Sequence, residues 1–451
     1  MLRRYLCRFC LKRKFGRLEH AWPAAARANK TNSTGVHMNQ GRFTFYSVAL
    51  LSSLAVFSIA AADIVVGDRS VGCADDPACI NRLHPDIPMV AKADPGERIV
   101  FLGRDAFDLT LDPDEFSSAK TMPRTGVGIV HALTGPVFIN GASAGDVLAV
   151  TIEAVEPDKV GWTEAGAFGF AGDEFGTDER FIVWRINDEY AVSDALPGVR
   201  IPNASFPGVV TTLPGDKLLA DVLAREQQLL DQGGAVMGPD PDEAEPAALC
   251  GVEGTKSAEC LRTIPPREHG GNMDIRYITT GTTVYLPCFV DGCGLAVGDF
   301  HYAQGDGEVA GTAIEMGGKM TVTTRIVDEP PNLSRGPHYE GPASVLGIPS
   351  ERFYAVTGFP LKEAGNMPAD LAYLDSPKIA GLSNLSADIN LAARNALAAM
   401  IDYIMSEYGY DQTEAYMIAS IAVDLRIGQL VDVPNVGVTA ILPLDIFVGR
   451  D

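Results

Sequence analysis

The sequence is poor in positive charge for its length. Its 451 residues include 36 Lys and Arg against 58 Asp and Glu, a formal net charge of −22. The basic residues gather at the start: residues 1–62 carry a net +9, which leaves −31 for the remainder of the chain. A body this acidic is poorly suited to nucleic acid or to an anionic membrane surface, and we expect neither as a partner.

Long apolar runs are missing as well. The run from Val48 to Ala60 is shorter than the roughly 20 apolar residues of a spanning helix. It ends in small residues up to Ala62, a pattern typical of a secretory signal peptide, and predicts cleavage near Ala62 and a periplasmic or secreted chain without membrane contact. Such signals seldom begin so far into a chain, so Met38 is an alternative start. A transit peptide over residues 1–37 and a membrane anchor over residues 48–62 stay open as alternatives.

Cysteine is scarce, and after the leader no two cysteines have the CxxC spacing of a zinc site. Cys7 and Cys10 would leave with the leader, and the other six cysteines fall into three close pairs. An even number in an exported chain predicts disulfides, although six cysteines allow many connectivities. We expect neighbours to pair: Cys73 with Cys79, Cys250 with Cys260, and Cys288 with Cys293.

Most of the remaining chain alternates short apolar runs with Gly-, Pro- and Asp-rich turns, which predicts strands. Helical periodicity is confined to residues 216–232, 387–409 and 411–427. We therefore expect one mainly β unit with some α over residues 63–451, with strand layers of jelly-roll or open-barrel type and a C-terminal helical pair packed on them. Its parts are a β-rich N-terminal part, a disulfide-bearing insertion, a core motif region and a helical part, over residues 63–233, 234–262, 263–330 and 380–430.

The densest group of polar side chains lies between Gly298 and Glu308. Asp299 and His301 are two residues apart, so a strand would point both to one face, where a carboxylate and an imidazole can hold a divalent metal. Gln304, Asp306 and Glu308 continue the same spacing. The alternative is a glycine-rich hairpin whose polar residues are solvated. Glu315 is expected to end the following strand-like run, residues 309–314.

Four other candidates lie outside this stretch. Asp105 follows a predicted strand over residues 98–102, and His131 stands at a strand entrance, where a hydrogen-bonded structural histidine is the commoner case. Asn272 and Asp274 follow paired glycines and would point to one side of an extended segment. Residues 162–182 mix glycine, phenylalanine and acids, which suits either a loop over a pocket or an ordinary surface loop.

The stretch from Pro265 to Glu315 resembles the acetamidase/formamidase family of amide hydrolases. The resemblance is carried by GGN-x-D-I, Y-L-P-x-F-V, V-G-D-x-H-x-A-Q-G-D-G-E and G-T-A-I-E, and it extends to residues 131–136 and 424–438, covering most of residues 85–447. It implies hydrolysis of small aliphatic amides such as acetamide or formamide, and a homodimer or larger assembly. Because amide hydrolysis needs a better nucleophile than neutral water, we expect a divalent metal, zinc, with calcium as the alternative. Met273 departs from the family, whose formamidases tend to have Cys there.

The resemblance and the spacing together give a hypothesis for the site. Asp299 and His301 would bind the metal, with His131 and Asp105 completing the set, and the metal would activate water. Either Glu315 or Glu308 would act as the general base, and Asn272, Asp274 and Gln304 would orient the amide. Disulfide pairing of Cys288 and Cys293 leaves a cysteine nucleophile without support, and we expect no serine-hydrolase elbow. The alternative function is a non-catalytic ligand- or cation-binding protein on the same β fold.

Overall fold

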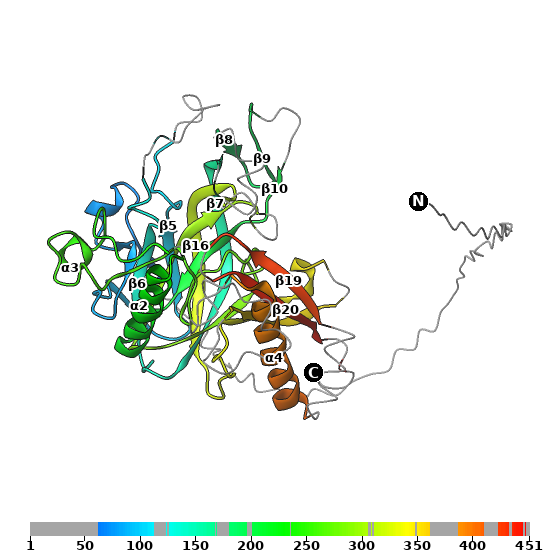
Figure 1. Ribbon diagram of the computed structural model, residues 1–451. Coiled ribbons are helices and arrows are strands. Elements are labelled where there is room, and N and C mark those ends of the chain that lie inside the picture. Colours follow the sequence, from blue (N-terminus) through cyan, green and yellow to red (C-terminus); the bar gives the residue numbers. More distant parts are fainter. Residues whose placement is uncertain are drawn as a thin grey trace, which may run out of the picture. The chain divides into compact units, whose positions relative to one another are not determined.

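A large, mostly antiparallel sheet system organises the chain (Figure 1). The computed structural model describes residues 62–111, 123, 126–166, 168, 180–195, 201–234, 236–304, 308, 311–347, 350–360, 387–409, 423–432, 435–444 and 447. Within these ranges, 18 strands join in one sheet and two form a second, and the helices are few. The expectation of a mainly β chain with some α is confirmed.

Strands outnumber helices in both halves of the chain. The first half holds β1 (Ile64–Val66), η1 (Cys73–Asp75), β2 (Cys79–Ile80), β3 (Arg82–Leu83), β4 (Ala91–Ala93), β5 (Arg98–Gly103), β6 (Leu133–Ile139), β7 (Val147–Ala165), β8 (Arg180–Ile186), β9 (Tyr190–Val192), β10 (Ile201–Pro202), β11 (Phe206–Thr211) and α2 (Asp216–Asp231). The second half holds α3 (Ala247–Cys250), β12 (Leu261–Arg262), β13 (Gly270–Asn272), β14 (Thr283–Pro287), β15 (Cys293–His301), β16 (Glu315–Ile326), β17 (His338–Pro342), η2 (Ala343–Val345), β18 (Arg352–Gly358), α4 (Ile389–Tyr408), β19 (Asp424–Gln429) and β20 (Gly437–Pro443).

Strand β15 is the buried centre of the sheet, since all nine of its residues are buried. It pairs antiparallel with β6, β11 and β16. The two longest strands, β7 and β16, run antiparallel side by side through the middle of Figure 1, and β16 also pairs with β5. Fully buried strands with apolar side chains on both faces need cover on both sides, which the neighbouring strands and helices supply.

Helix α2 is tied to the segment that leads into β13. Its buried Leu218, Leu219 and Val222 pack with apolar residues of β3, β11 and β12. Two buried arginine pairs add polar contacts: Arg225 binds Glu268 through both Nη atoms at 2.5 and 2.6 Å, and Arg267 binds Glu226 at 2.6 Å. Paired, hydrogen-bonded charges of this kind hold one geometry. They fix the start of β13, the strand that ends at Asn272.

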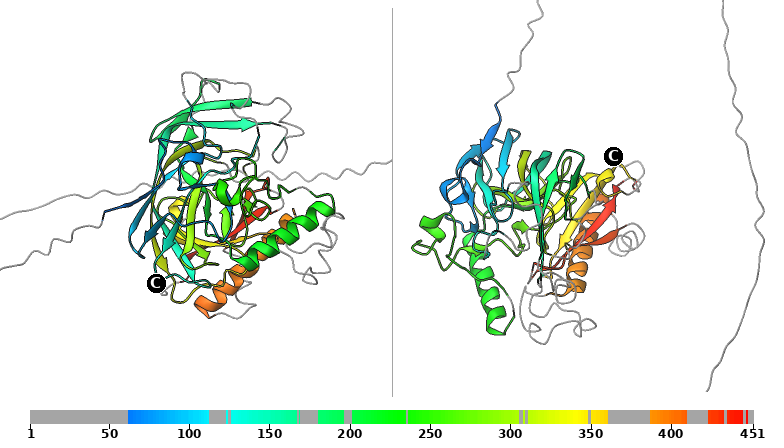
Figure 2. Two further views of the ribbon diagram at one scale, coloured as in Figure 1. Left: turned by 90° about the vertical axis from the view of Figure 1, so that its left-hand side faces the viewer. Right: turned by 90° about the horizontal axis from the view of Figure 1, so that it is seen from above.

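Helix α4 packs on β18 and β20 through an apolar face that includes Ala396, Ala399, Met400 and Ile404. Asp388 caps its first turn by accepting from the N–H groups of residues 390 and 391, and Gly409 ends it in the left-handed conformation. The right-hand view of Figure 2 shows α4 (orange) well apart from α2 (green), each beside its own strands. Both helices agree with the predicted ranges.

The predicted second C-terminal helix is wrong where the structure describes it. Residues 411–422 lie outside the described ranges, but Asp424–Gln429 is strand β19, paired antiparallel with β20. Leu425 and Ile427 are exposed on alternate positions of this strand. Local periodicity at helical spacing is overridden here because pairing with β20 satisfies the backbone along its length. Glu315 is a second correction, since it begins β16 instead of ending a strand.

The three predicted disulfides are present: Cys73–Cys79, Cys250–Cys260 and Cys288–Cys293. The second of them holds the 234–262 segment, whose β12 pairs with β3 in the small sheet. No helix among the residues with a described position is long and apolar enough to cross a bilayer.

Candidate active site

The strand register brings residues far apart in sequence into one row across the sheet. His301, the last residue of β15, is the register partner of Glu315, the first residue of β16. Glu315 faces Trp162 of β7 on its other side, and His301 faces Phe206 of β11. Residues opposite each other on neighbouring strands share a face. A carboxylate and an imidazole therefore meet between two aromatic rings.

Asp299 joins the row from the same strand as His301. Its Oδ2 lies 3.4 Å from His301 Nε2, and Glu315 Oε2 lies 3.1 Å from the same nitrogen. All three side chains are buried. Asp299 has a φ of +54°, so the strand is strained at this point. The predicted same-face arrangement of Asp299 and His301 is present in the structure.

A glycine on the adjacent strand leaves room for two carboxylates. A Cβ added at Gly208 of β11 would lie 2.6 Å from Asp299 Oδ2 and 2.6 Å from Asp274 Oδ1. A Cβ carbon does not approach an oxygen this closely, so a side chain at 208 would displace both carboxylates. Nothing in the local sequence distinguishes Gly208, because its role depends on the pairing of β11 with β15.

Gln304 orients the imidazole of His301. Its Nε2 donates to the carbonyl of Asp274 at 2.9 Å, and its Oε1 lies 3.0 Å from His301 Nδ1. A carbonyl only accepts, so the amide oxygen must face Nδ1, which then carries the hydrogen. In the neutral ring, His301 Nε2 then has its lone pair toward Asp299 and Glu315. Gln304, which was predicted to orient substrate, contacts His301 and does not line the cavity beside it.

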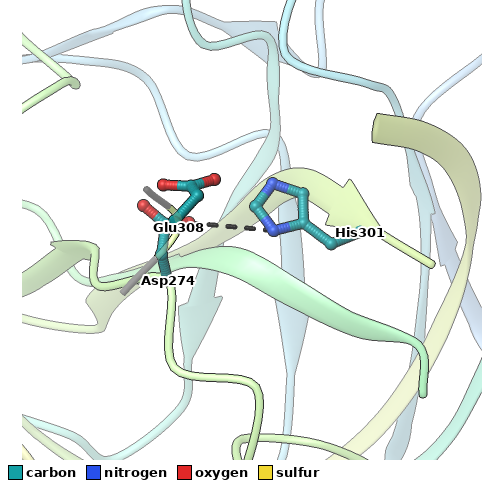
Figure 3. A group of neighbouring side chains, drawn as sticks. All are labelled: Asp274, His301 and Glu308. Atoms are coloured by element: carbon teal, nitrogen blue, oxygen red, sulfur yellow. Dashed lines mark ion pairs between the residues drawn. The ribbon is translucent and has the colours of Figure 1, made fainter. Parts of the chain in front are cut away.

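Among the residues that the structure describes, two groups of side chains have donor atoms close enough together to hold a metal ion. They are Asp299, His301 and Glu315, and Asp274, His301 and Glu308, with His301 in common. Figure 3 shows the second group converging, with Asp274 Oδ1 3.9 Å from His301 Nδ1. Because Nδ1 is already engaged by Gln304, the first group, at the free Nε2, is the better ligand set.

Buried polar atoms without a hydrogen-bond partner indicate whether these residues fit a cation. In the described part of the chain, Asp274 Oδ1, Asp299 Oδ1, His301 Nε2 and Glu315 Oε2 are buried and accept or donate no hydrogen bond. Leaving so many polar atoms unsatisfied in one place is costly. Carboxylate oxygens and an imidazole nitrogen are the ligands that a divalent metal such as zinc takes. The residues fit such an ion.

The electrostatics of the group favour a positive charge at its centre. Burial opposes the charged form of His301, but the carboxylates of Glu315 and Asp299 outweigh it and raise the pKa of His301 well above its usual value. Burial also acts on Asp299, yet His131 and His301 hold its pKa well below the usual range. Burial raises the pKa of Glu315 to about 8 against the pull of His301. A divalent cation at His301 Nε2 would satisfy both carboxylates.

His131 reaches the edge of this group, and Asp105 does not reach it. His131 Nε2 lies 3.8 Å from Asp299 Oδ2, while its Nδ1 lies 3.1 Å from the hydroxyl of Thr263. The carboxylate of Asp105 accepts from the N–H groups of Phe107 and Leu109 at 2.9 Å each, and it lines a different cavity. The loop after β5 turns back on itself, and its own N–H groups bind the carboxylate of Asp105. The structure therefore does not bring this residue into either ligand group.

A cavity of about 360 Å³ opens on the ligand group. Its polar lining comes from residues of both halves of the chain: His131, Glu164, Asn272, Asp274, Asp299, Glu308, Thr312, Glu315 and Asp432. Its apolar lining includes Phe107, Trp162 and Phe168. Phe168 belongs to the segment for which a loop over a pocket was one of two expectations, and its neighbours 169–179 lie outside the described residues.

Asp432 is the residue that sequence reasoning missed most clearly. It follows β19, and its Oδ2 accepts from Asn272 Nδ2 at 3.0 Å. Burial, then the carboxylates of Asp274 and Glu308, raise the pKa of Asp432 well above its usual value. Asp432 lies within a stretch that matches the family by sequence, but nothing local links residue 432 to residue 272 or gives it a role.

Neither Ser143 nor Met273 provides a nucleophile at the site. Ser143 lies in Gly141-Ala-Ser-Ala-Gly145, which has the spacing of a serine-hydrolase elbow, but this turn joins two strands and Ser143 is exposed. An elbow requires a strand followed by a helix. Met273, at the position where family formamidases tend to have Cys, is buried in the main core and does not line the cavity.

Comparison with known proteins agrees with this geometry. The model of the acetamidase/formamidase family matches residues 68–448. The chain belongs to this family. Among acetamidase/formamidase relatives, a formamidase of Methylophilus methylotrophus is 31% identical over 392 residues, covering 81% of this chain and 89% of its own. An acetamidase of Mycolicibacterium smegmatis is 31% identical over 373 residues, covering 75% and 84%.

Solved structures share the fold. A γ-lactamase from Delftia acidovorans superposes with a TM-score of 0.57 at 28% identity, covering 86% of this chain and 94% of that one. An acetamidase from Bacillus halodurans superposes with a TM-score of 0.60 at 21% identity, covering 86% and 99%. The family resemblance predicted from the motifs is confirmed.

Proposed function

We propose that the chain hydrolyses small aliphatic amides to a carboxylate and ammonia, with a divalent metal held by Asp299, His301 and Glu315. The observation that carries the proposal is the position of His301 Nε2, buried without a hydrogen-bond partner, between the carboxylates of Asp299 and Glu315, both of which line the cavity. The names of the relatives, formamidase and acetamidase, support the same reaction. A metal held by these three residues would lower the pKa of water and so provide a stronger nucleophile.

Glu308 is the residue best placed to move protons. One carboxylate oxygen of Glu315 accepts from Ala313 N at 2.9 Å, and the other faces His301 Nε2. Both oxygens are therefore engaged, and Glu315 is better suited to bind the metal than to transfer protons. Glu308 lines the cavity, and burial, then Asp274, raise its pKa well above the usual value. A general acid–base group works best with a pKa near the working pH. Glu308 takes a proton from the attacking water and gives it to the nitrogen as the C–N bond breaks.

The amide group is oriented by Asn272 with Asp432. Asn272 Oδ1 lines the cavity, buried and without a hydrogen-bond partner, and Asp432 holds the amide nitrogen of the same side chain. An unused acceptor in a cavity is suited to the NH₂ of a primary amide, which has two hydrogens to donate. Asp274, beside them, completes the polar end of the cavity.

Ammonia release from formamide, acetamide and propionamide tests the proposal. Release by the purified chain is expected to fall to background after chelation and to return with added metal. His301→Ala is expected to lose both the metal and turnover. His84→Ala, a change at another buried histidine, is the control and should keep both. Bound metal without release from any amide would support the alternative, a cation-binding protein.

The ligand set favours zinc over calcium. Calcium takes oxygen ligands, whereas an imidazole with two carboxylates is a common zinc set. Elemental analysis of the purified chain is expected to give about one zinc per chain. Calcium alone would contradict this assignment without affecting the proposed reaction.

Export and assembly are part of the proposal. The three disulfides support an oxidising compartment, in line with the signal peptide expected to end near Ala62. Sequencing the N-terminus of the mature protein and counting thiols without reductant test export. Light scattering tests the expected homodimer or larger assembly.

A further inference from the structure

The cavity is too large and too apolar for acetamide alone. Acetamide has four heavy atoms and fills roughly 100 Å³ on a scale where a water takes about 30 Å³. The cavity measures about 360 Å³. Allowing for the catalytic water and one more, roughly 200 Å³ stays unfilled. The unfilled volume can hold a further part of a larger substrate.

The residues that line the cavity indicate which part of the substrate it holds. Asp274, Asp299 and Glu315 gather around His301, with His131 beside Asp299 and Asn272 bound to Asp432, and the reaction is proposed to occur there. Beside this polar group, and besides Glu164 and Thr312, the lining includes six apolar residues: Ala106, Phe107, Val130, Trp162, Ile264 and Val431. The Phe107 and Trp162 rings meet edge to face with centroids 5.6 Å apart, which makes a firm aromatic wall. Apolar walls cannot recognise the polar amide group, so they face its acyl substituent.

Three exposed apolar side chains line the same cavity. Val127, Phe168 and Met237 line it and are 39%, 44% and 43% exposed. Elsewhere in the described residues, the large exposed apolar side chains belong to other elements and do not line this cavity. A gathering of them at an open pocket marks a binding surface. They come from three separate segments, so no single loop conformation creates the gathering.

We propose that the preferred substrates are primary amides whose acyl group carries a bulky apolar substituent, such as phenylacetamide or hexanamide. This inference rests on the proposed function for the reaction itself. The carboxamide lies against Asn272 and Asp274, and the substituent lies between the Phe107–Trp162 wall and the rim formed by Val127, Phe168 and Met237. The chemistry is ordinary hydrolysis: water adds to the carbonyl carbon, the C–N bond breaks, and ammonia leaves with the acid.

The test compares kcat/KM for ammonia release from acetamide, butanamide, hexanamide and phenylacetamide. Burying each added methylene is expected to raise kcat/KM severalfold, so that hexanamide and phenylacetamide exceed acetamide at least tenfold. Phe168→Ala and Met237→Ala should each lower kcat/KM about fivefold more for phenylacetamide than for acetamide. Val252→Ala, at a residue 63% exposed and absent from the cavity, is the matched control.

A flat or falling series with measurable acetamide hydrolysis would overturn the inference and leave the proposed function standing. A binding measurement separates the two in the other direction. Glu308→Gln, which should bind without turnover, is expected to bind phenylacetamide at least tenfold more tightly than acetamide by calorimetry. If no amide is hydrolysed by the native chain but this preference is found, the inference about the pocket stands and the hydrolytic assignment fails. Equal binding would overturn the inference.

Discussion

At the scale of single residues, the two glutamates proposed as the base have different surroundings. Glu315 is tied to Ala313 N and to His301 Nε2 by strand register. Glu308 lies in the cavity and belongs to the other group of acids. The sequence could not separate them, because both follow His301 within a short distance and only the register of β15 with β16 selects Glu315 as its partner.

Glu308→Gln and Glu315→Gln are therefore expected to fail in different ways. Glu308→Gln should lower kcat at least a hundredfold and keep the metal, because it removes a proton-transfer group. Glu315→Gln should lose metal as well as turnover. Metal content by elemental analysis, measured beside ammonia release, distinguishes them. Loss of metal in both variants would show that Glu308 is also a ligand.

Gly208 gives a steric prediction at the same scale. Gly208→Ala should displace Asp299 and Asp274, lowering metal affinity and kcat/KM at least a hundredfold, since its Cβ would also lie 2.9 Å from a backbone oxygen that cannot move freely. Gly238→Ala is the control, because its nearest neighbour would lie at an ordinary 3.7 Å. Full activity in Gly208→Ala would show that the carboxylates have room to move.

At the scale of elements, the Cys73–Cys79 disulfide supports the site from behind. It packs with Val130 and Ala132, the residues on either side of His131, and with Phe107. The Cys250–Cys260 disulfide packs instead with helix α2 and its neighbours. The two disulfides close short loops, with sequence separations of 6 and 10.

Replacing each cysteine pair by serine should lower the free energy of unfolding by about 2–3 kcal/mol, since the loops are short and similar. The activities should differ: loss of Cys73–Cys79 is expected to lower kcat/KM at least fivefold, and loss of Cys250–Cys260 less than twofold. Urea unfolding and ammonia release, both measured well below the unfolding midpoint, check this. Equal losses of activity would mean that the first disulfide acts through overall stability.

At the scale of the whole molecule, burial of neutral histidines makes the fold sensitive to acid. Burial lowers the pKa of His338 to about 3, and burial with the nearby Arg267 lowers that of His269 to about 3. In the unfolded chain an imidazole binds a proton below about pH 6.5. Between pH 6.5 and 3 the unfolded state therefore binds more protons, and stability falls as the pH falls.

Below pH 6.5, each of these histidines is expected to lower the free energy of unfolding by up to about 1.4 kcal/mol per pH unit. Acids with raised pKa values, such as Glu315, act in the opposite direction, so the slope of one histidine must be isolated by difference. Urea unfolding of the native chain and of His338→Gln, at pH 7.5, 6, 5 and 4 with chelator present, gives that difference. Parallel curves would show that His338 is protonated in the folded chain.

The sequence by itself determined the β-rich class, the ranges of α2 and α4, the disulfide pairs and the family. These depend on local periodicity, on close spacing and on a motif that is continuous along the chain. It also placed Asp299 and His301 on one face, since a spacing of two along a strand needs no partner strand.

Only the tertiary structure decided the rest of the site. Strand β19 exists because β20 pairs with it, Glu315 is a partner of His301 because of register, and Gly208 matters because β11 lies beside β15. Asp432 reaches Asn272 across 160 residues, while Asp105 is held by its own loop. Such contacts depend on which strands become neighbours, and that is set by the burial of the whole sheet.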